Sequence, residues 1–295
     1  MQDERELLVA FARDLNPRYL QRFRCIGAAC EDHCCYRWIV RVDGETYQRL
    51  RVLTAGDRDE RNRLRRAIRL EPGRKGARSF AIRPLPDRTC PLLDGKLCHL
   101  QLRYGAALLP NGCAQYPRRL QRVGEHLELS AMPSCPEVVR ELIASDDALD
   151  LLPLDESLIT RRKIYASVDW RDALPFARSL NELRAFAIAR LRDRDRPLEE
   201  RFFALALFAK RASPLLSPSP GAAQPETLRA EMQSLREPAT LDALGARVDT
   251  IETPAALAFE LVRIVLGPAA QASFNYPLYH ALVDTALAQL GRPTA

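Results

Sequence analysis

The chain has 295 residues, of which 47% are apolar and 28% charged, the composition of an ordinary soluble globular protein. That length suits one large domain or two ordinary ones. No apolar run reaches the roughly 18 residues of a transmembrane helix, and the acidic N-terminus does not resemble a secretory signal, so we expect a cytoplasmic protein with no membrane partner.

The formal net charge is +6, and only four of the 44 basic residues are lysines. An excess of basic over acidic residues can indicate an acidic partner such as nucleic acid. The excess is modest for a nucleic-acid-binding protein of this length. We therefore favour a solvated, arginine-rich surface over nucleic-acid binding.

The first elements are predicted from apolar spacing and capping residues. Leu7, Leu8 and Phe11 have helical spacing, and Asp43 is placed to cap a helix that runs to about Leu53. The predicted order is a helix at 3–14, an extended segment at 18–24, a strand at 38–42, the capped helix, and a second helix at 57–70.

Arginines 58, 61, 65 and 69 form a stripe along the predicted 57–70 helix. The stripe could bind an acidic partner. It could also be a solvated surface whose arginines pair with Asp57, Glu60 and Glu71, and we favour this second interpretation slightly.

Turn signals dominate the next segment. Asp94-Gly95 predicts a hairpin between Cys90 and Cys98, and Gly124-Glu125 predicts another over 119–130. Before the first hairpin we expect a loop at 72–76 and a strand at 79–85, and directly after it a short helix at 98–104. A helix over 134–143 would start at Ser134 as N-cap, with Glu137 completing a capping box.

From about residue 155 onward, apolar residues recur with the spacing typical of helices. The predicted helices span 171–192, 197–212, 226–237, 240–249, 253–266 and 277–291, with a proline-rich loop at 213–225. The expected fold class is α+β. A cysteine-rich module of short hairpins and helices around a metal centre (1–150) is followed by a mainly α-helical region (151–295).

The cysteines carry the strongest functional signal. All eight precede residue 136: Cys25, Cys30, Cys34, Cys35, Cys90, Cys98, Cys113 and Cys135. A cytosolic chain is kept reduced, so clustered thiols indicate a metal site more than a disulfide framework. Because such a site forms only with folding, serine at Cys30, Cys90 or Cys113 is expected to destabilise the module.

The spacing of these cysteines bears on the kind of centre. Zinc sites commonly use Cys-x2-Cys pairs, and this chain has none. Dispersed thiolates suit a bulky [4Fe–4S] cluster better, so we favour iron–sulfur and keep zinc as the alternative. Neighbouring side chains diverge, so Cys34 and Cys35 are not expected on the same ion. His33 and His99 could each replace a thiolate.

Other motifs with known chemistry are missing. The chain has no dinucleotide-binding Gly-x-Gly-x-x-Gly, Walker loop, Gly-x-Ser-x-Gly or His-Glu-x-x-His, and no Cys-x3-Cys-x2-Cys of radical S-adenosylmethionine enzymes.

A set of short motifs in fixed order resembles the flagellin lysine-N-methylase family. It begins with FRCIGAACEDHCCYRW from Phe23 to Trp38 and covers about residues 17–140. Further on come CPL at Cys90, Leu97-Cys98, CAQYPR at Cys113, Gly124 and SCPE at Ser134. The set is also similar to zinc- or iron-chelating cysteine-cluster domains.

The resemblance implies an iron–sulfur protein that transfers methyl groups from S-adenosylmethionine to lysines of flagellin. An attacking lysine must first lose a proton, so a general base is needed. Glu31, Asp32 and Tyr116 lie in the cysteine module and are the candidate catalytic residues. The alternative is a non-enzymatic cysteine-cluster protein that binds zinc or iron, senses redox state or binds a partner.

Overall fold

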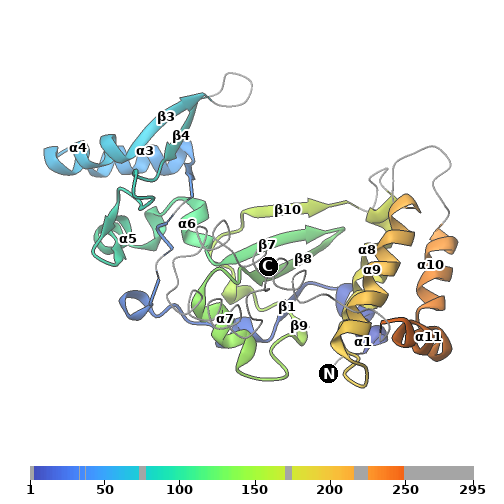
Figure 1. Ribbon diagram of the computed structural model, residues 1–295. Coiled ribbons are helices and arrows are strands. Elements are labelled where there is room, and N and C mark those ends of the chain that lie inside the picture. The colour runs from blue at the N-terminus through green and yellow to red at the C-terminus, as the bar shows by residue number, and fades with distance from the viewer. Residues whose placement is uncertain are drawn as a thin grey trace, which may run out of the picture. The chain divides into compact units, whose positions relative to one another are not determined.

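The computed structural model describes residues 3–32, 34–36, 38–72, 78–169, 175–215 and 225–248. They fall into two compact units, one from Val9 to Val168 and the other from Asp169 onward together with Asp3–Leu8. The sequence placed a boundary at residue 150, whereas the first unit includes the strand that ends at Val168. Both units contain helices and the first contains sheets, which confirms an α+β protein (Figure 1).

The first unit contains a five-stranded sheet in the order β10-β7-β8-β1-β9. Its strands are β1 (Leu15–Pro17), β7 (Arg118–Val123), β8 (His126–Ala131), β9 (Leu151–Pro153) and β10 (Ile164–Val168). The predicted hairpin is confirmed as β7–β8, and Gly124 in its turn has φ 59°. The expectation that only helices follow residue 155 is wrong, because residues 164–168 pair in parallel with β7.

Two helices pack on the core of this sheet, α2 (Tyr19–Arg22) and α7 (Pro136–Ile143). The predicted extended segment at 18–24 is wrong, since it contains the helical turn α2. The Tyr19 hydroxyl holds this turn to the sheet by accepting a hydrogen bond of 2.8 Å from the amide of Ala131. At α7 the N-cap is Cys135 rather than Ser134, and the carboxylate of Glu137 pairs with Arg140, so no capping box forms.

A three-stranded sheet in the same unit has the order β2-β4-β3, from β2 (Val40–Val42), β3 (Ile68–Pro72) and β4 (Arg78–Ile82). Helices α3 (Gly44–Leu53) and α4 (Arg58–Ala67) lie between β2 and β3 in sequence. Asp43 caps α3 as predicted, accepting from the Thr46 amide at 2.8 Å. The 57–70 helix was predicted too long, because Ile68 already pairs with Ile82 of β4.

Short elements connect this sheet to β7. They are β5 (Leu93–Asp94), β6 (Leu97–Cys98), α5 (His99–Tyr104), α6 (Asn111–Gln115) and the 3-10 turn Ala106–Leu108. The Asp94-Gly95 hairpin is confirmed, with Gly95 at φ 58°. Leu92, Leu100 and Leu108 are buried in one core with Val40 and Leu50, and several cysteines pack against it.

The second unit is helical in its described part: α8 (Pro175–Arg192), α9 (Leu198–Leu215), α10 (Pro225–Ser234) and α11 (Pro238–Val248), with the start of α1 (Glu4–Phe11). Phe186, Phe208, Met232 and Leu235 lie in its core. Four predicted helices are confirmed within a few residues. Those at 253–266 and 277–291, and most of the 213–225 loop, lie outside the described residues. Each described helix is too short or too polar to cross a lipid bilayer.

Candidate functional site

Five of the eight cysteines line one small cavity of about 30 Å³ in the first unit. They come from separate segments: Cys34 and Cys35 from the loop before β2, Cys90 from the loop before β5, Cys98 from the end of β6, and Cys113 from α6. Two backbone contacts join the first two segments. The amide of Cys90 donates to the carbonyl of Cys35 at 2.8 Å, and Tyr36 forms a β-bridge with Thr89.

The thiol of Cys35 is at the centre of this group. Its sulfur lies close enough to those of Cys34, Cys90 and Cys98 for hydrogen bonding, and its single proton can be donated to one of them at a time. These contacts raise the pKa of the Cys35 thiol. They lower the pKa of the Cys34 and Cys90 thiols, against the opposing effect of burial. Cys34 and Cys35, although adjacent, therefore turn their sulfurs into the same cavity.

Cys98 has a strongly lowered pKa. Its pKa is lowered to about 6, first by the hydrogen bond from Cys35 and then by the backbone amides of Gln101 and Leu100 in the first turn of α5. Thiolate is the form of cysteine that binds metals. By contrast, burial raises the pKa of Cys113, which lies deeper in the cavity.

The other three cysteines form a second group. The thiol of Cys135 lies near enough to Cys25 and Cys30 for their charges to raise its pKa, although burial is the larger cause. Cys25 is exposed, and Cys30 is partly exposed. The segment 25–35 thus contributes to both groups, a division that spacing alone does not reveal.

The thiol-lined cavity provides the donor set that zinc and iron–sulfur centres require. Four thiolates suffice for either centre, and five thiols converge here from three parts of the chain. No group of three or more His, Cys, Asp or Glu in the described ranges is arranged to hold a single metal ion. The residues fit such a centre by the chemistry and number of their donors.

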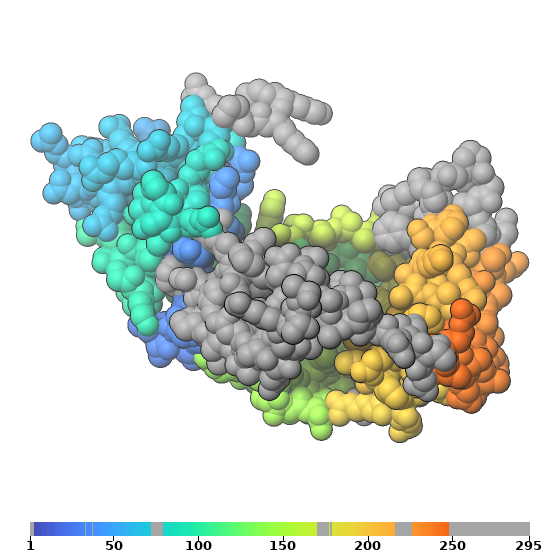
Figure 2. All heavy atoms as spheres, in the orientation of Figure 1, coloured from blue at the N-terminus to red at the C-terminus, as the bar shows by residue number. Residues whose placement is uncertain are grey.

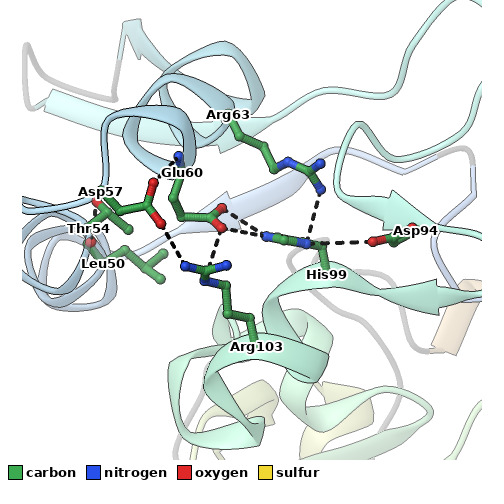
Figure 3. A network of polar contacts seen from close by, with 8 residues as sticks. All are labelled: Leu50, Thr54, Asp57, Glu60, Arg63, Asp94, His99 and Arg103. Carbon is green, nitrogen blue, oxygen red and sulfur yellow. Dashed lines mark hydrogen bonds and ion pairs between the residues drawn. The ribbon is translucent and has the colours of Figure 1, made fainter.

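His99 does not serve as a sixth donor in this cavity (Figure 3). Its Nε2 is 2.8 Å from a carboxylate oxygen of Glu60, and its Nδ1 is 3.0 Å from a guanidinium nitrogen of Arg63. Because a guanidinium only donates, Nδ1 must accept, and Nε2 carries the proton that is donated to Glu60. Both ring nitrogens are thereby occupied. His33 lies outside the described residues.

Glu60 links α4 to α5 directly beside Cys98. Its side chain is only 4% exposed and is also 3.1 Å from Nε of Arg103, whose guanidinium binds Asp57 at 2.7 Å (Figure 3). A buried carboxylate is stable only when its partners are in place. The network therefore fixes the start of α5, and with it the position of Cys98. Periodicity of the sequence gives no sign of this contact.

Glu31, Asp32 and Tyr116, the candidate catalytic residues, differ in their surroundings. Glu31 forms an ion pair with Arg140, whose hydrogen bond lowers the pKa of the carboxyl and makes it a weaker base. Asp32 lies close enough to Cys30, Cys34 and Tyr116 for its negative charge to oppose their ionisation, although other causes are larger for each group. It therefore lies near both cysteine groups.

The phenol of Tyr116 is 3.2 Å from the hydroxyl of Ser134, and burial raises its pKa to about 12. Its ring is 6.1 Å from that of Trp38, which lines the thiol cavity. Trp38 also donates from Nε1 to the carbonyl of Cys34 at 2.7 Å. The Tyr116 ring therefore packs near the Trp38 ring, which lines the thiol cavity.

Comparison with known proteins gives three curated relatives. The lysine-N-methylase of Salmonella typhimurium is 31% identical over 138 residues, which are 46% of this chain and 33% of that protein. The flagellar biosynthetic protein FliU of Salmonella muenchen is 30% identical over 138 residues, covering 79% of its length. The lysine-N-methylase of Salmonella choleraesuis is 30% identical, with 33% covered.

The match thus spans about a third of the length of the two lysine-N-methylases. No family model matches the chain. No solved structure matches it either.

Proposed function

The chain belongs to the flagellin lysine-N-methylase family, and from this membership we propose that it methylates lysine side chains of flagellin with S-adenosylmethionine as methyl donor. The observation that carries the proposal is the match to lysine-N-methylase and FliU together with the thiol cavity. We place this reaction in the cytoplasm, where the thiols stay reduced.

We propose that four of the five cavity thiols hold a [4Fe–4S] cluster, with zinc as the alternative. The soft thiolate set and the lowered pKa of Cys98 support a metal centre of this kind. When bound, the centre would cross-link the 34–35, 90–98 and 113 segments and supply its charge to the neighbouring site. The second group, Cys25, Cys30 and Cys135, is not needed for it.

Methyl transfer requires a neutral lysine amine. The lone pair of Nζ forms the new bond to the methyl carbon, the bond from that carbon to sulfur breaks, and S-adenosylhomocysteine leaves as a neutral thioether. The lysine side chain must therefore lose a proton before it attacks, because the pKa of free lysine is about 10.4. We assign Asp32 as the base that accepts this proton, because Glu31 is engaged by Arg140. Tyr116, protonated at neutral pH, would orient the amine by a hydrogen bond.

A second function stays in view, that of a non-enzymatic cysteine-cluster protein. The observation in its favour is coverage: the match spans most of FliU, whose name states no activity, and a third of the lysine-N-methylases. In that case the thiol centre would hold the fold, and binding of a partner would be the function.

Incubation of anaerobically purified protein with methyl-labelled S-adenosylmethionine and flagellin tests directly whether the protein transfers methyl groups. We expect label on lysine residues of flagellin, and none when the flagellin lysines are first blocked by acetylation. If protein that contains its metal neither transfers the label nor binds S-adenosylmethionine, the methyltransferase function is rejected and the non-enzymatic binding function is favoured. Elemental analysis of the same sample for iron, sulfide and zinc decides the centre separately.

A further inference from the structure

A groove of about 470 Å³ lies between α3 and α4, separate from the thiol cavity. Three guanidiniums line it, those of Arg51 from α3 and of Arg61 and Arg65 from α4. Its lining contains no carboxylate. This part of the chain is the light-blue surface in Figure 2.

Three neighbouring carboxylates are engaged by other side chains. Asp57 and Glu60 bind Arg103, and Glu60 also binds His99. Glu71 binds Arg41 and Arg83. The intrahelical pairs expected between the α4 arginine stripe and Asp57, Glu60 and Glu71 are therefore not formed. Within the described residues, none of the three groove guanidiniums has an ion pair with a carboxylate.

One of these arginines is held in position by a hydrogen bond. Arg61 donates to the carbonyl of Ala55 at 2.6 Å, while the guanidinium of Arg51 lies 6.0 Å from the centre of the Tyr47 ring, at the outer limit of a cation–π contact. Fixed guanidiniums lose little conformational freedom on binding an anion, and their planar donors match phosphate and carboxylate oxygens. Three such charges around one hollow also raise the local positive potential.

The floor of the groove is apolar. Leu50, Leu64 and Ile68 line it and are each 6% exposed or less. Tyr47 lies beside them, with its ring stacked on Phe80 at 3.8 Å between centroids. A groove with an apolar floor and cationic sides is matched by a ligand with an apolar body and an anionic group. Its volume is within the range of about 300–1,000 Å³ found for small-molecule sites.

We propose that the groove between α3 and α4 binds a small organic anion, a phosphate or carboxylate attached to an apolar or aromatic body. Arg51 and Arg65 bind the anionic group, Arg61 supports them from its fixed position, and the apolar body lies on Leu50, Leu64 and Ile68. The site is independent of the thiol cavity and of methyl transfer.

Naphthyl phosphate is a suitable probe, with naphthol as its uncharged analogue, in calorimetric titrations of the full chain. We expect naphthyl phosphate to bind measurably tighter than naphthol, and inorganic pyrophosphate to compete with it. The double variant Arg51→Gln, Arg65→Gln should weaken binding of naphthyl phosphate by about tenfold or more, the loss of charge-assisted hydrogen bonds.

The matched control is Arg58→Gln, Arg66→Gln, which removes the same charge from exposed positions of α4 that do not line the groove. It should change binding by less than about twofold. Equal weakening in the two double variants would show general attraction to a basic surface and overturn the proposal. Equal affinity for naphthol, or no competition by pyrophosphate on the unmodified protein, would overturn it too, without reliance on any variant.

Discussion

A Cβ atom at Gly112 would stand 3.2 Å from the indole ring of Trp38, closer than side chains ordinarily pack. The ring has little room to retreat, because its Nε1 donates a 2.7 Å hydrogen bond to the carbonyl of Cys34. Gly112 precedes Cys113, and Trp38 lines the cavity with it. Close approach of α6 to this ring therefore helps to set the position of two cavity cysteines.

Gly112→Ala should destabilise the first unit by about 1 kcal/mol through overpacking, despite the better helix propensity of alanine. The measurement is denaturant unfolding followed by Trp38 fluorescence in a Trp170→Phe background. Gly56→Ala is the matched control, because a Cβ there has no neighbour within 4 Å. Equal stability of the Gly112 variant and the parent protein would contradict the packing argument.

Serine substitutions separate the two cysteine groups. Cys90→Ser and Cys113→Ser should lose most of the metal that the protein contains and lower its thermal stability, because both residues line the cavity. Cys30→Ser and the exposed Cys25→Ser should retain the metal. This refines the sequence-based expectation, which treated Cys30 like the other two. Elemental analysis after anaerobic purification checks it, and loss of metal from the Cys25 variant equal to that from the Cys90 variant would refute the grouping.

Glu60→Gln should destabilise the protein by about 1–3 kcal/mol, because glutamine is uncharged and has one acceptor oxygen, so its buried NH2 group must face a donor of either His99 or Arg103. Asp59→Asn, one residue earlier and exposed, is the control and should change stability by less than about 0.5 kcal/mol. Unfolding in urea measures both. If the two variants were equally stable, the network could not be fixing α5 and Cys98.

Asp32→Asn should lower the rate of methyl transfer to flagellin by a factor of about 100 or more if Asp32 accepts the lysine proton. Glu31→Gln should lower it far less, since Glu31 is already engaged by Arg140. The rate is measured under saturating donor, after metal content is shown to be equal. Raising the pH should partly restore the Asp32 variant, because more lysine is then neutral. The reverse ranking of the two variants would exclude Asp32 as the base.

The helical unit should lose stability on acidification through Glu182. Two hydrogen bonds from Arg229, of 2.8 and 2.7 Å, hold the pKa of this carboxyl below its ordinary value. Because this carboxyl has a lower pKa in the folded protein than in the unfolded chain, the ion pair stabilises the fold at pH values above the unfolded pKa of about 4.3. The contribution is lost as the pH falls through the pKa of the folded state. Solvent screens the pair, whose carboxylate is 31% exposed, so we expect about 0.5–1 kcal/mol.

Comparison of Glu182→Gln with the parent protein isolates this contribution. The difference in unfolding free energy should be present at pH 6 and shrink as the pH falls below the ordinary value of about 4.3. Glu199→Gln, exposed in the first turn of α9, should show no such trend. A difference that stayed constant with pH would contradict the ion-pair explanation.

Local signals in the sequence predicted many elements correctly. The Asp94-Gly95 and Gly124 turns, the Asp43 cap and the helices of the second unit all depend on residues within a few positions of one another. The prediction was wrong where pairing with another strand, either the next one along the chain or a distant one, decided the backbone conformation. Ile68–Pro72 became a strand beside β4, and Ile164–Val168 became a strand beside β7, because those neighbours satisfied their amides and carbonyls.

The sequence by itself determined that eight cysteines gather before residue 136, and the ordered motifs around them indicated the family. Only the tertiary structure decided that five of them share a cavity and that the adjacent Cys34 and Cys35 both face it. It also decided that Glu60 serves His99 and Arg103 instead of the α4 arginines, leaving a cationic groove. Side-chain direction in an irregular loop, and the choice among several charged partners, depend on distant segments that spacing along the chain does not encode.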